Sequence, residues 1–327
     1  MLRWAILGTG FISNTVVEAI AMSPGSTVEI VAGRNGDSVE EFRQAHDIER
    51  GVVGYEAAIA DAAVDAVYIG TPNHQHHPYV IAAAAAGKAI LSEKSLTTTM
   101  ATAHELIDAV RDRVFFVEGL MYLAHPLFRT FEDLLTDERI GRVTAVHARY
   151  AANIGHLVNP LGGGTIYNLG CYPASLLQLV MRTVFGRDAF GQRSMTGAGT
   201  TTPDDTIGSA VASIRFDNGV LATLASTDDY GMAHDFSVMT DRGELRFETN
   251  PWLPRADHNA ISWKPYEGEP EVVAVADGHD AFFHQIRMVE AAVAAGETEA
   301  PHPSPQLDDS MALMHLLTEW ERLAHAG

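Results

Sequence analysis

The sequence predicts an α/β domain built on a doubly wound parallel sheet, followed by an α+β domain whose large, mostly antiparallel open sheet carries helices on one face. Three observations support this prediction. Short apolar runs alternate with helical patterns up to about residue 120, strand-like segments with tight turns follow residue 142, and a glycine-rich turn follows the first strand. At 327 residues the chain is longer than a typical single domain, and we expect the domains at 1–120 and 121–327.

The N-terminal part contains five apolar runs that we interpret as strands. Helical patterns lie between them, for example at 78–86 and 100–111. Alternation of this kind predicts a parallel sheet with helices on both faces. The predicted strands are residues 4–7, 28–32, 66–69, 89–91 and 114–117.

The C-terminal part changes character after residue 142. Segments such as "TIGSAVASIRF" and "GVLATLASTDD" follow one another across the turn "DNG", which is typical of an antiparallel meander or sheet. A helix is predicted at 170–183, and two helices finish the chain. The first of these, at 280–295, has apolar residues at helical spacing, so one of its faces belongs to a core.

Composition narrows the range of functions. The formal charge is −20, which disfavours nucleic acid and anionic membranes as partners, and no apolar run approaches the ~20 residues of a membrane-spanning helix. The single cysteine, Cys171, cannot form an internal disulfide and is expected to be a small buried residue. The opening "MLRWAILGTG" has no pattern of a secretory leader, so we expect a cytoplasmic protein.

A dinucleotide-binding turn follows the first predicted strand. "AILGTGFIS" has the form Gly-x-Gly-x-x-Ser and leads directly into a helical pattern. Gly8 permits the tight turn, Gly10 allows close approach of a pyrophosphate, and Ser13 takes the place of the third small residue. The N-terminus of the helix then offers N–H groups to the phosphates. We therefore expect a Rossmann domain, with Thr9, Phe11 and Ile12 in the cofactor loop beside the two glycines.

The end of the second predicted strand indicates which dinucleotide is bound. Sites that prefer NAD usually have an acidic residue here for the adenosine ribose, but this strand ends in Gly33 and Arg34. A cation suits a 2′-phosphate, and the Ser38 hydroxyl can add a hydrogen bond. These residues favour NADP(H) over NAD(H).

Motifs from Gly8 to Pro173 resemble those of the glucose-fructose oxidoreductase, inositol dehydrogenase and MocA superfamily (Gfo/Idh/MocA). The resemblance is strongest to the branch of dimeric dihydrodiol dehydrogenases and NADP-dependent xylose dehydrogenases, and with the strand-rich second half it covers nearly the whole chain. The matching motifs are "GTGFIS", "TPNHQHH", "AAGKAILSEKSL", "FVEGLMYLAHP" and "GGGTIYNLGCYP".

The resemblance implies roles for particular residues. Lys94 matches the lysine of the family's Glu-Lys-Pro motif, which is tied to catalysis, and Tyr172 matches the acid/base position of the second domain. Two residues depart from the pattern. Asn168 replaces a frequent aspartate, and Ser95 replaces the proline, so the bond after Lys94 is either trans with a reshaped loop or cis.

The chemistry of hydride transfer suits these residues. A carbinol that loses a hydride to nicotinamide must also lose its hydroxyl proton, so the protein must supply a base and hold the oxygen. An ammonium group favours the phenolate form of a nearby tyrosine, which makes Lys94 and Tyr172 a suitable pair. Asn168 can only hydrogen-bond, so Tyr172 must carry more of the proton transfer.

Other polar residues lie after predicted strands, where sheet ligands bind. We expect Thr71, Pro72, Asn73, His76 and Lys94 to contact the cofactor and Glu93 to orient Lys94 or the nicotinamide ribose. We expect the substrate to contact His156, Asn168 and Tyr172. No metal site is expected, because the histidines of "NHQHH" have no acidic or cysteine partners at ligand spacing.

We therefore expect an NAD(P)-dependent dehydrogenase or reductase that acts on a sugar, polyol or related hydroxyl compound. Two alternatives stay open: an NADP-binding regulator without catalysis, and a non-redox enzyme that retains its cofactor, such as a glycoside-cleaving relative. A net change in NADPH concentration during the reaction distinguishes the dehydrogenase or reductase from both alternatives. An antiparallel sheet with one uncovered face also predicts a homodimer or homotetramer.

Overall fold

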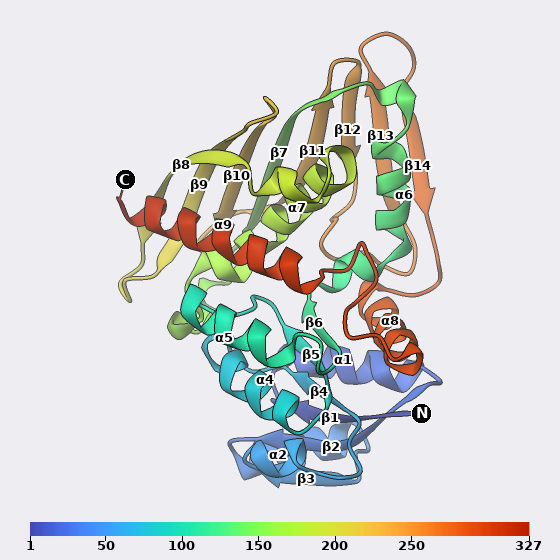
Figure 1. Cartoon of the computed structure of the whole chain (residues 1–327), viewed down its shortest axis with the longest axis vertical. Helices are drawn as coiled ribbons and strands as arrows, with labels where there is room; N and C mark the ends of the chain where they lie inside the picture. The colour runs from blue at the N-terminus through green and yellow to red at the C-terminus, as the bar shows by residue number, and fades with distance from the viewer. Residues whose placement is uncertain (327) are drawn as a thin grey trace. The chain divides into compact units, whose positions relative to one another are not determined.

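The structure is a computed structural model that describes residues 1–326. The chain forms two compact units (Figure 1). The first consists of Met1–Ala124 and Phe282–Met311, and the second of His125–Ala281 and residues 312–326. The first unit is therefore discontinuous in sequence, whereas the sequence pattern predicts two continuous domains.

Six parallel strands form the sheet of the first unit, in the order β3-β2-β1-β4-β5-β6. The order reverses between β1 and β4, and ligands of doubly wound sheets bind beyond the carboxyl ends of the strands at such a switch point. The predicted Rossmann topology is confirmed. The strands are β1 (Leu2–Leu7), β2 (Ser26–Gly33), β3 (Arg50–Val53), β4 (Ala66–Ile69), β5 (Ala89–Glu93) and β6 (Phe116–Gly119).

Helices bury both faces of this sheet. Alternate strand residues such as Trp4, Ile6 and Leu91 form one buried cluster with apolar residues of α1 and α8, including Ile20 and Val289. β4 is buried at every position, as a central parallel strand requires. The helices are α1 (Phe11–Met22), α2 (Gly36–Ala45), α3 (Glu56–Ile59), α4 (His76–Ala85), α5 (Met100–Val110) and α8 (Ala281–Ala295), with short 3-10 turns η1 (Asn73–Gln75) and η2 (Met121–Ala124).

Eight strands form the sheet of the second unit, in the order β14-β13-β12-β11-β7-β10-β9-β8. All neighbours are antiparallel except β7 and β10, because the first strand of the unit inserts between β11 and β10. The sheet is thus mostly antiparallel, as expected, but is not a simple meander. The strands are β7 (Val143–Ala152), β8 (Arg193–Thr201), β9 (Ile207–Phe216), β10 (Leu221–Thr227), β11 (Met232–Thr240), β12 (Gly243–Phe247), β13 (Asn259–Pro265) and β14 (Glu271–Val275).

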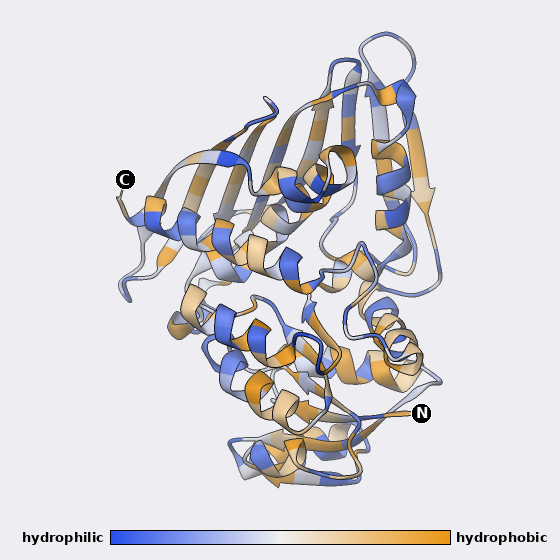
Figure 2. Cartoon of the chain, in the orientation of Figure 1, coloured by the Kyte–Doolittle hydropathy of each residue, from blue (hydrophilic) through white to orange (hydrophobic). Residues whose placement is uncertain are grey.

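Helices cover one face of this sheet and leave the other open (Figure 1). Buried and exposed residues alternate along β9 and β10. Figure 2 shows bands of apolar and polar residues along the strands of this sheet. No helix within residues 1–326 is long and apolar enough to cross a membrane. The helices are α6 (Pro126–Leu135), α7 (Cys171–Phe185) and α9 (Leu307–Ala326), with short helices η3 (Glu138–Ile140), η4 (Gly155–Leu157), η5 (Pro160–Gly162), η6 (Ile166–Gly170) and η7 (Arg187–Phe190).

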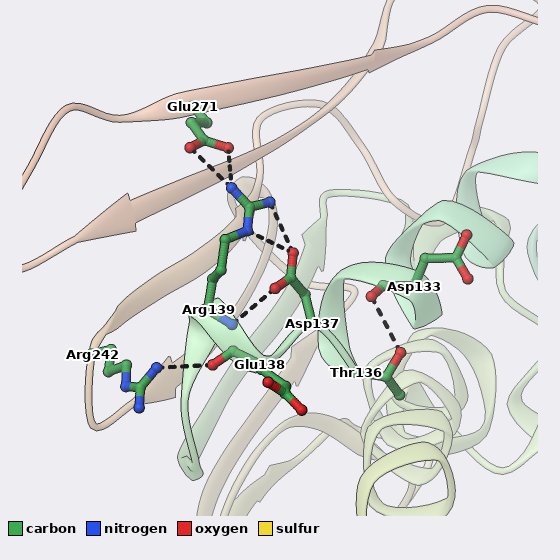
Figure 3. A network of polar contacts seen from close by, with 7 residues as sticks. All are labelled: Asp133, Thr136, Asp137, Glu138, Arg139, Arg242 and Glu271. Atoms are coloured by element: carbon green, nitrogen blue, oxygen red, sulfur yellow. Dashed lines mark hydrogen bonds and ion pairs between the residues drawn. The ribbon is translucent and has the colours of Figure 1, made fainter.

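A polar network connects the turn before β7 to the edge strand β14 (Figure 3). The Arg139 guanidinium donates to Asp137 Oδ2 at 2.9 Å and to Glu271 at 3.3 Å, and Arg242 donates to the Glu138 carbonyl at 2.9 Å. The Arg139 side chain is 62% exposed, so solvent screens its ion pairs and they add little stability. The network therefore fixes geometry at the sheet edge more than it adds stability.

Candidate active site

The glycine turn after β1 has the geometry of a dinucleotide loop. Gly8 has φ +112°, and a Cβ added to it would lie 2.8 Å from the Gly70 carbonyl oxygen, so only glycine fits here. Gly10 precedes α1, no side chain caps this helix, and a Cβ on Gly10 would meet nothing within 4 Å. The turn therefore leaves open space in front of the N–H groups of α1, which suits a pyrophosphate.

Ser13 fills the position of the third small residue. Its side chain is fully buried, and a Cβ on Gly70 would lie 2.6 Å from Ser13 Oγ, so the end of β4 packs directly against α1. Phe11, by contrast, is 87% exposed, and Ile12 is half-buried. The predicted contribution of Phe11 and Ile12 to cofactor binding thus rests on their backbone at the helix start.

The end of β2 brings Arg34 close to the glycine turn. A Cβ on Gly33 would lie 3.3 Å from Thr9 Cγ2, so the residue before Arg34 is adjacent to the loop. Arg34 is exposed, and burial raises the pKa of the nearby Tyr55 while the Arg34 charge and hydrogen bond oppose that rise. Ser38 is exposed in the first turn of α2, and its N–H donates to the capping Asn35 side chain at 3.0 Å.

The predicted Thr71–His76 segment follows β4. His76 is fully buried, with Nε2 2.8 Å from the Thr71 carbonyl and Nδ1 2.9 Å from the Ser95 carbonyl. Burial, together with the Lys94 charge, lowers the pKa of His76 to about 4 against the opposing backbone hydrogen bonds, so the imidazole is neutral at neutral pH. His76 therefore connects the ends of β4 and β5 through backbone groups, while Pro72 and Asn73 are half-buried beside it.

Lys94 directly follows β5 and is only half-buried. The Lys94–Ser95 peptide bond is cis, which answers the question that the missing proline raised. Ser95 is fully buried, and the N–H of the next residue, Leu96, donates to Glu118 Oε1 at 2.8 Å. His76 from α4 and Glu118 from β6 thus hold the backbone immediately after Lys94.

Two buried carboxyl groups accompany Lys94. Glu93 accepts a hydrogen bond from the Tyr68 hydroxyl at 3.0 Å, and burial raises its pKa against the opposing Lys94 charge. Burial also raises the pKa of Glu118 to about 7, although Ser310, the Leu96 N–H and Lys94 all oppose this. Glu118 is missing from the sequence prediction. An acid at the end of the apolar run "VFFVEG" was the available signal.

The candidate residues of the second unit cluster around η6 and α7. Asn168 lies in η6, a π-helix, a form that occurs frequently at functional sites. Tyr172, four residues later, is the second residue of α7. The Tyr172 ring is 8% exposed and lies edge-on to Tyr150, with centroids 5.4 Å apart. Cys171 is fully buried, as expected.

A second acid missing from the sequence prediction lies beside Asn168. Asn168 Nδ2 donates to Asp228 Oδ2 at 3.4 Å, and the Asp228 carbonyl accepts the Gly155 N–H at 2.7 Å. Gly155 begins η4, which carries the exposed His156. Burial raises the pKa of Asp228 to about 6. The acidic pair that ends "LASTDD", directly after a strand, was the sequence signal.

The histidines after β4 do not assemble a metal site. Within residues 1–326, no group of three or more His, Cys, Asp or Glu side chains is arranged to hold a metal ion. His77 instead pairs with Glu105, with Nε2 3.0 Å from Oε2.

Comparisons with known proteins give the family. A profile described as "Oxidoreductase family, NAD-binding Rossmann fold" matches residues 2–117, and one described as "GFO/IDH/MocA C-terminal domain" matches residues 128–246. Trans-1,2-dihydrobenzene-1,2-diol dehydrogenase of Bos taurus is 27% identical over 286 residues, covering 82% of each chain. D-xylose 1-dehydrogenase (NADP(+)) 2 of Haloferax volcanii is 27% identical over 336 aligned positions, covering 100% of this chain and 98% of the relative.

Solved structures share the fold. The 3-ketoreductase KijD10 from Actinomadura kijaniata, in complex with TDP-benzene and NADP, has a TM-score of 0.85 at 25% identity, covering 99% of this chain and 97% of its own. Levoglucosan dehydrogenase, in complex with NADH and levoglucosan, has a TM-score of 0.83 at 18% identity, with the same coverage. The cofactor turn, the sheet topologies and the two profiles agree, and the chain belongs to the Gfo/Idh/MocA family of NAD(P)-dependent oxidoreductases.

Proposed function

We propose that this chain is an NADP(H)-preferring dehydrogenase or reductase that transfers a hydride between the nicotinamide and a carbon of a sugar, polyol or related compound. The observation that carries the proposal is the environment of Lys94. Lys94 follows β5 at the carboxyl ends of the parallel strands, where the Gly8 turn also follows β1. Buried side chains hold the backbone next to Lys94. The nicotinamide, when bound, supplies or accepts the hydride.

Lys94 and Tyr172 handle the proton in this proposal. In the oxidative direction, the substrate hydroxyl gives its proton to the Tyr172 phenolate while the C–H bond donates its hydrogen and two electrons as hydride, which leaves a carbonyl. The Lys94 ammonium favours the phenolate and holds the substrate oxygen. Asn168 contributes hydrogen bonds without titrating. The roles of Lys94 and Tyr172 are inferred from the family motifs and from elementary chemistry.

The NADP preference is supported by the second strand. β2 ends without an acid, and the exposed Arg34 directly follows Gly33, which lies beside Thr9. The Arg34 side chain also hydrogen-bonds the buried Tyr55. A guanidinium at this position can bind a 2′-phosphate with two hydrogen bonds. The Haloferax relative is named as NADP-dependent and the Actinomadura ketoreductase was solved with NADP, whereas levoglucosan dehydrogenase was solved with NADH.

The sugar-like substrate class is supported by the names of the relatives. They include a xylose dehydrogenase, a dihydrodiol dehydrogenase and a structure with levoglucosan bound. The compounds in these names carry hydroxyl groups on a ring. The second unit offers polar side chains at one place, since Asn168, Asp228 and the His156 segment are joined by hydrogen bonds. Hydroxyl recognition needs such fixed polar groups.

We also propose a homodimer that forms through the open face of the eight-stranded sheet. Exposed side chains along β9 and β10 are mostly short, and the face includes Val211 at 55% and Leu221 at 54% exposure. Arg149 and Arg246 flank Asp235 on the neighbouring strands β7, β11 and β12. Short side chains on a flat face permit close packing of a second sheet, and a two-fold axis pairs the same patch with itself.

A substrate panel tests the proposed activity. The protein should be assayed with aldoses, polyols, keto-sugars and diols, with NADP and NAD in both directions, and absorbance at the nicotinamide band should be followed. We expect turnover with at least one compound and a higher kcat/KM with NADP(H). NADPH binding without turnover on any compound favours a regulator. Product formed without net absorbance change favours a non-redox enzyme that retains its cofactor.

A further inference from the structure

We propose that Asp228 is a positioning residue of the second unit, which orients the Asn168 side chain and the His156 segment toward the substrate. The inference rests on the proposed function and adds a residue to it. It starts from the location of Asp228 directly after β10, where its side chain is buried and only 3% of the residue is exposed. Among the described residues of the second unit, no other acid is buried to this degree.

Asp228 connects the predicted substrate contacts through separate groups. Its carbonyl accepts the N–H of Ile154 at 2.9 Å and that of Gly155 at 2.7 Å, which fixes the start of the turn that carries His156. Its carboxylate accepts from Asn168 Nδ2 at 3.4 Å, at the long end of a hydrogen bond. Its own N–H donates to the Gly208 carbonyl at 3.2 Å. Three elements thus meet at one buried acid.

The carboxylate determines the orientation of the Asn168 amide. An ionised carboxylate only accepts hydrogen bonds, so Asn168 must turn Nδ2 toward Asp228 and direct Oδ1 the other way. The amide therefore directs an acceptor, rather than a donor, away from Asp228. An acceptor suits a substrate hydroxyl.

The protonation state of Asp228 controls this orientation. Burial, together with the charge of the nearby Asp229, raises the pKa of Asp228 to about 6, although the hydrogen bond from Asn168 opposes the rise. Protonated Asp228 can donate to Asn168 Oδ1, and the amide then loses its fixed polarity. Asp229 is exposed. Among the described residues, it is the charged group that shifts the pKa of the Asp228 carboxyl group.

The raised pKa of Asp228 also distinguishes a positioning role from a role in stability alone. A group with a raised pKa in the folded state contributes stability below its unfolded value, and that stability is lost as the pH rises through about 6. Ionised Asp228 is therefore unfavourable for folding at about pH 7.5. If Asp228 served stability alone, Asp228→Asn would lower the melting temperature, whereas a positioning role predicts an equal or higher melting temperature together with weaker catalysis.

The experiment compares the wild type with Asp228→Asn, Asp229→Asn and the exchange variant Asn168→Asp/Asp228→Asn in the full-length protein. We expect Asp228→Asn to lower kcat/KM by about tenfold, without a change in NADPH affinity, because an amide at position 228 can donate as well as accept and no longer fixes which way the Asn168 amide turns. Its kcat/KM should also lose the wild-type decline below about pH 6. The exposed neighbour variant Asp229→Asn should stay within about twofold of wild type.

The exchange variant provides the rescue. It returns a carboxylate to the pair at position 168, next to Tyr172, and should recover most of the lost kcat/KM, because one acid and one amide again face each other. Equal kcat/KM for wild type and Asp228→Asn, or a lower melting temperature with an unchanged pH profile, would overturn the role of Asp228. A wild type without turnover on any compound of the panel would instead overturn the proposed function.

Discussion

The Leu96 N–H donates to Glu118 Oε1 at 2.8 Å, two residues after Lys94, and this bond connects the proposed catalytic loop to β6. On the preceding residue, the Ser95 carbonyl lies 2.9 Å from His76 Nδ1. Two successive residues are thus held by buried titratable side chains, His76 at the start of α4 and Glu118 on β6. Such paired backbone contacts limit the positions that the Lys94 side chain can reach.

Replacement of Glu118 by glutamine should change the pH dependence of stability. The glutamine side chain would retain an acceptor for the Leu96 N–H but never ionise. Burial raises the pKa of Glu118 from 4.5 to about 7, so the stability it contributes is full below pH 4.5 and is lost as the pH rises through about 7. In urea titrations, Glu118→Gln should be more stable than wild type at about pH 8 by ~1–3 kcal/mol, and the difference should narrow toward about pH 5.

A control variant separates charge from hydrogen bonding at Glu118. Glu118→Ala leaves the buried Leu96 N–H without its acceptor and should be less stable than Glu118→Gln at every pH, by ~1–3 kcal/mol. A difference between wild type and Glu118→Gln that does not vary with pH would contradict the raised pKa.

Replacement of Lys94 by methionine should remove turnover and keep the cofactor bound. The proposed phosphate-binding turn at Gly8 and Gly10 lies elsewhere in the unit, so NADPH affinity, measured by fluorescence titration, should change less than about threefold. The loss in kcat should be ~100-fold or more, the range for removal of a proton-handling group. Lys88→Met is the matched control, since Lys88 precedes β5 and donates to backbone carbonyls of Asp61 and Val64. A Lys94→Met enzyme with the wild-type rate contradicts the assignment.

Replacement of Arg34 by aspartate should reverse the cofactor preference. The acid repels a 2′-phosphate and can accept from the ribose hydroxyls of NAD, so the Kd of NADPH should rise by ~10-fold or more while that of NADH stays or falls. Arg113→Asp, an exposed substitution in the same unit after α5, controls for the change in net charge. Equal losses for both cofactors would exclude a 2′-phosphate contact at Arg34.

Introduction of a charge on the open sheet face should dissociate the proposed dimer. Val211→Arg places a guanidinium near the middle of β9, where two-fold packing would bring it close to its own copy. Light scattering at micromolar concentration should then report half the wild-type mass. Leu253→Arg, an exposed loop position at 46%, is the matched control and should leave the mass unchanged. A wild type that is already monomeric contradicts the proposal directly.

Much of the fold was predictable because it depends on local patterns. The four buried residues of β4 and the glycine turn after β1 both follow from sequence alone, as does α8 at Ala281–Ala295. β3 was missed because it is a four-residue edge strand with alternating exposure and therefore carries no apolar run. The insertion of β7 between β10 and β11 was also missed, because strand order depends on contacts distant in sequence.

The site was predictable only where motifs carried it. Glu118 and Asp228 were missed, because an acid near a strand end resembles an ordinary surface residue until burial and partners are known. His76 was predicted as a pocket residue, but its fully buried ring contacts two backbone carbonyls. Sequence pattern identifies the residue type at a strand end, whereas the partner across the sheet depends on strand order.

Two glycine substitutions in the turn after β1 should have different effects, since one should lower stability and the other should lower NADPH affinity. Gly8→Ala introduces a Cβ at φ +112° and 2.8 Å from the Gly70 carbonyl, so the unit should lose ~1–3 kcal/mol of stability.

Gly10 differs from Gly8 in both respects, since its φ of −81° suits alanine and a Cβ there would meet nothing within 4 Å. Gly10→Ala should therefore melt within about two degrees of wild type. The added methyl instead occupies the space that the pyrophosphate needs, so NADPH affinity should fall ~10-fold or more. Thermal melts without cofactor, together with NADPH titrations, separate the two effects. Unchanged NADPH affinity in Gly10→Ala would mean that the cofactor phosphates do not bind at this turn.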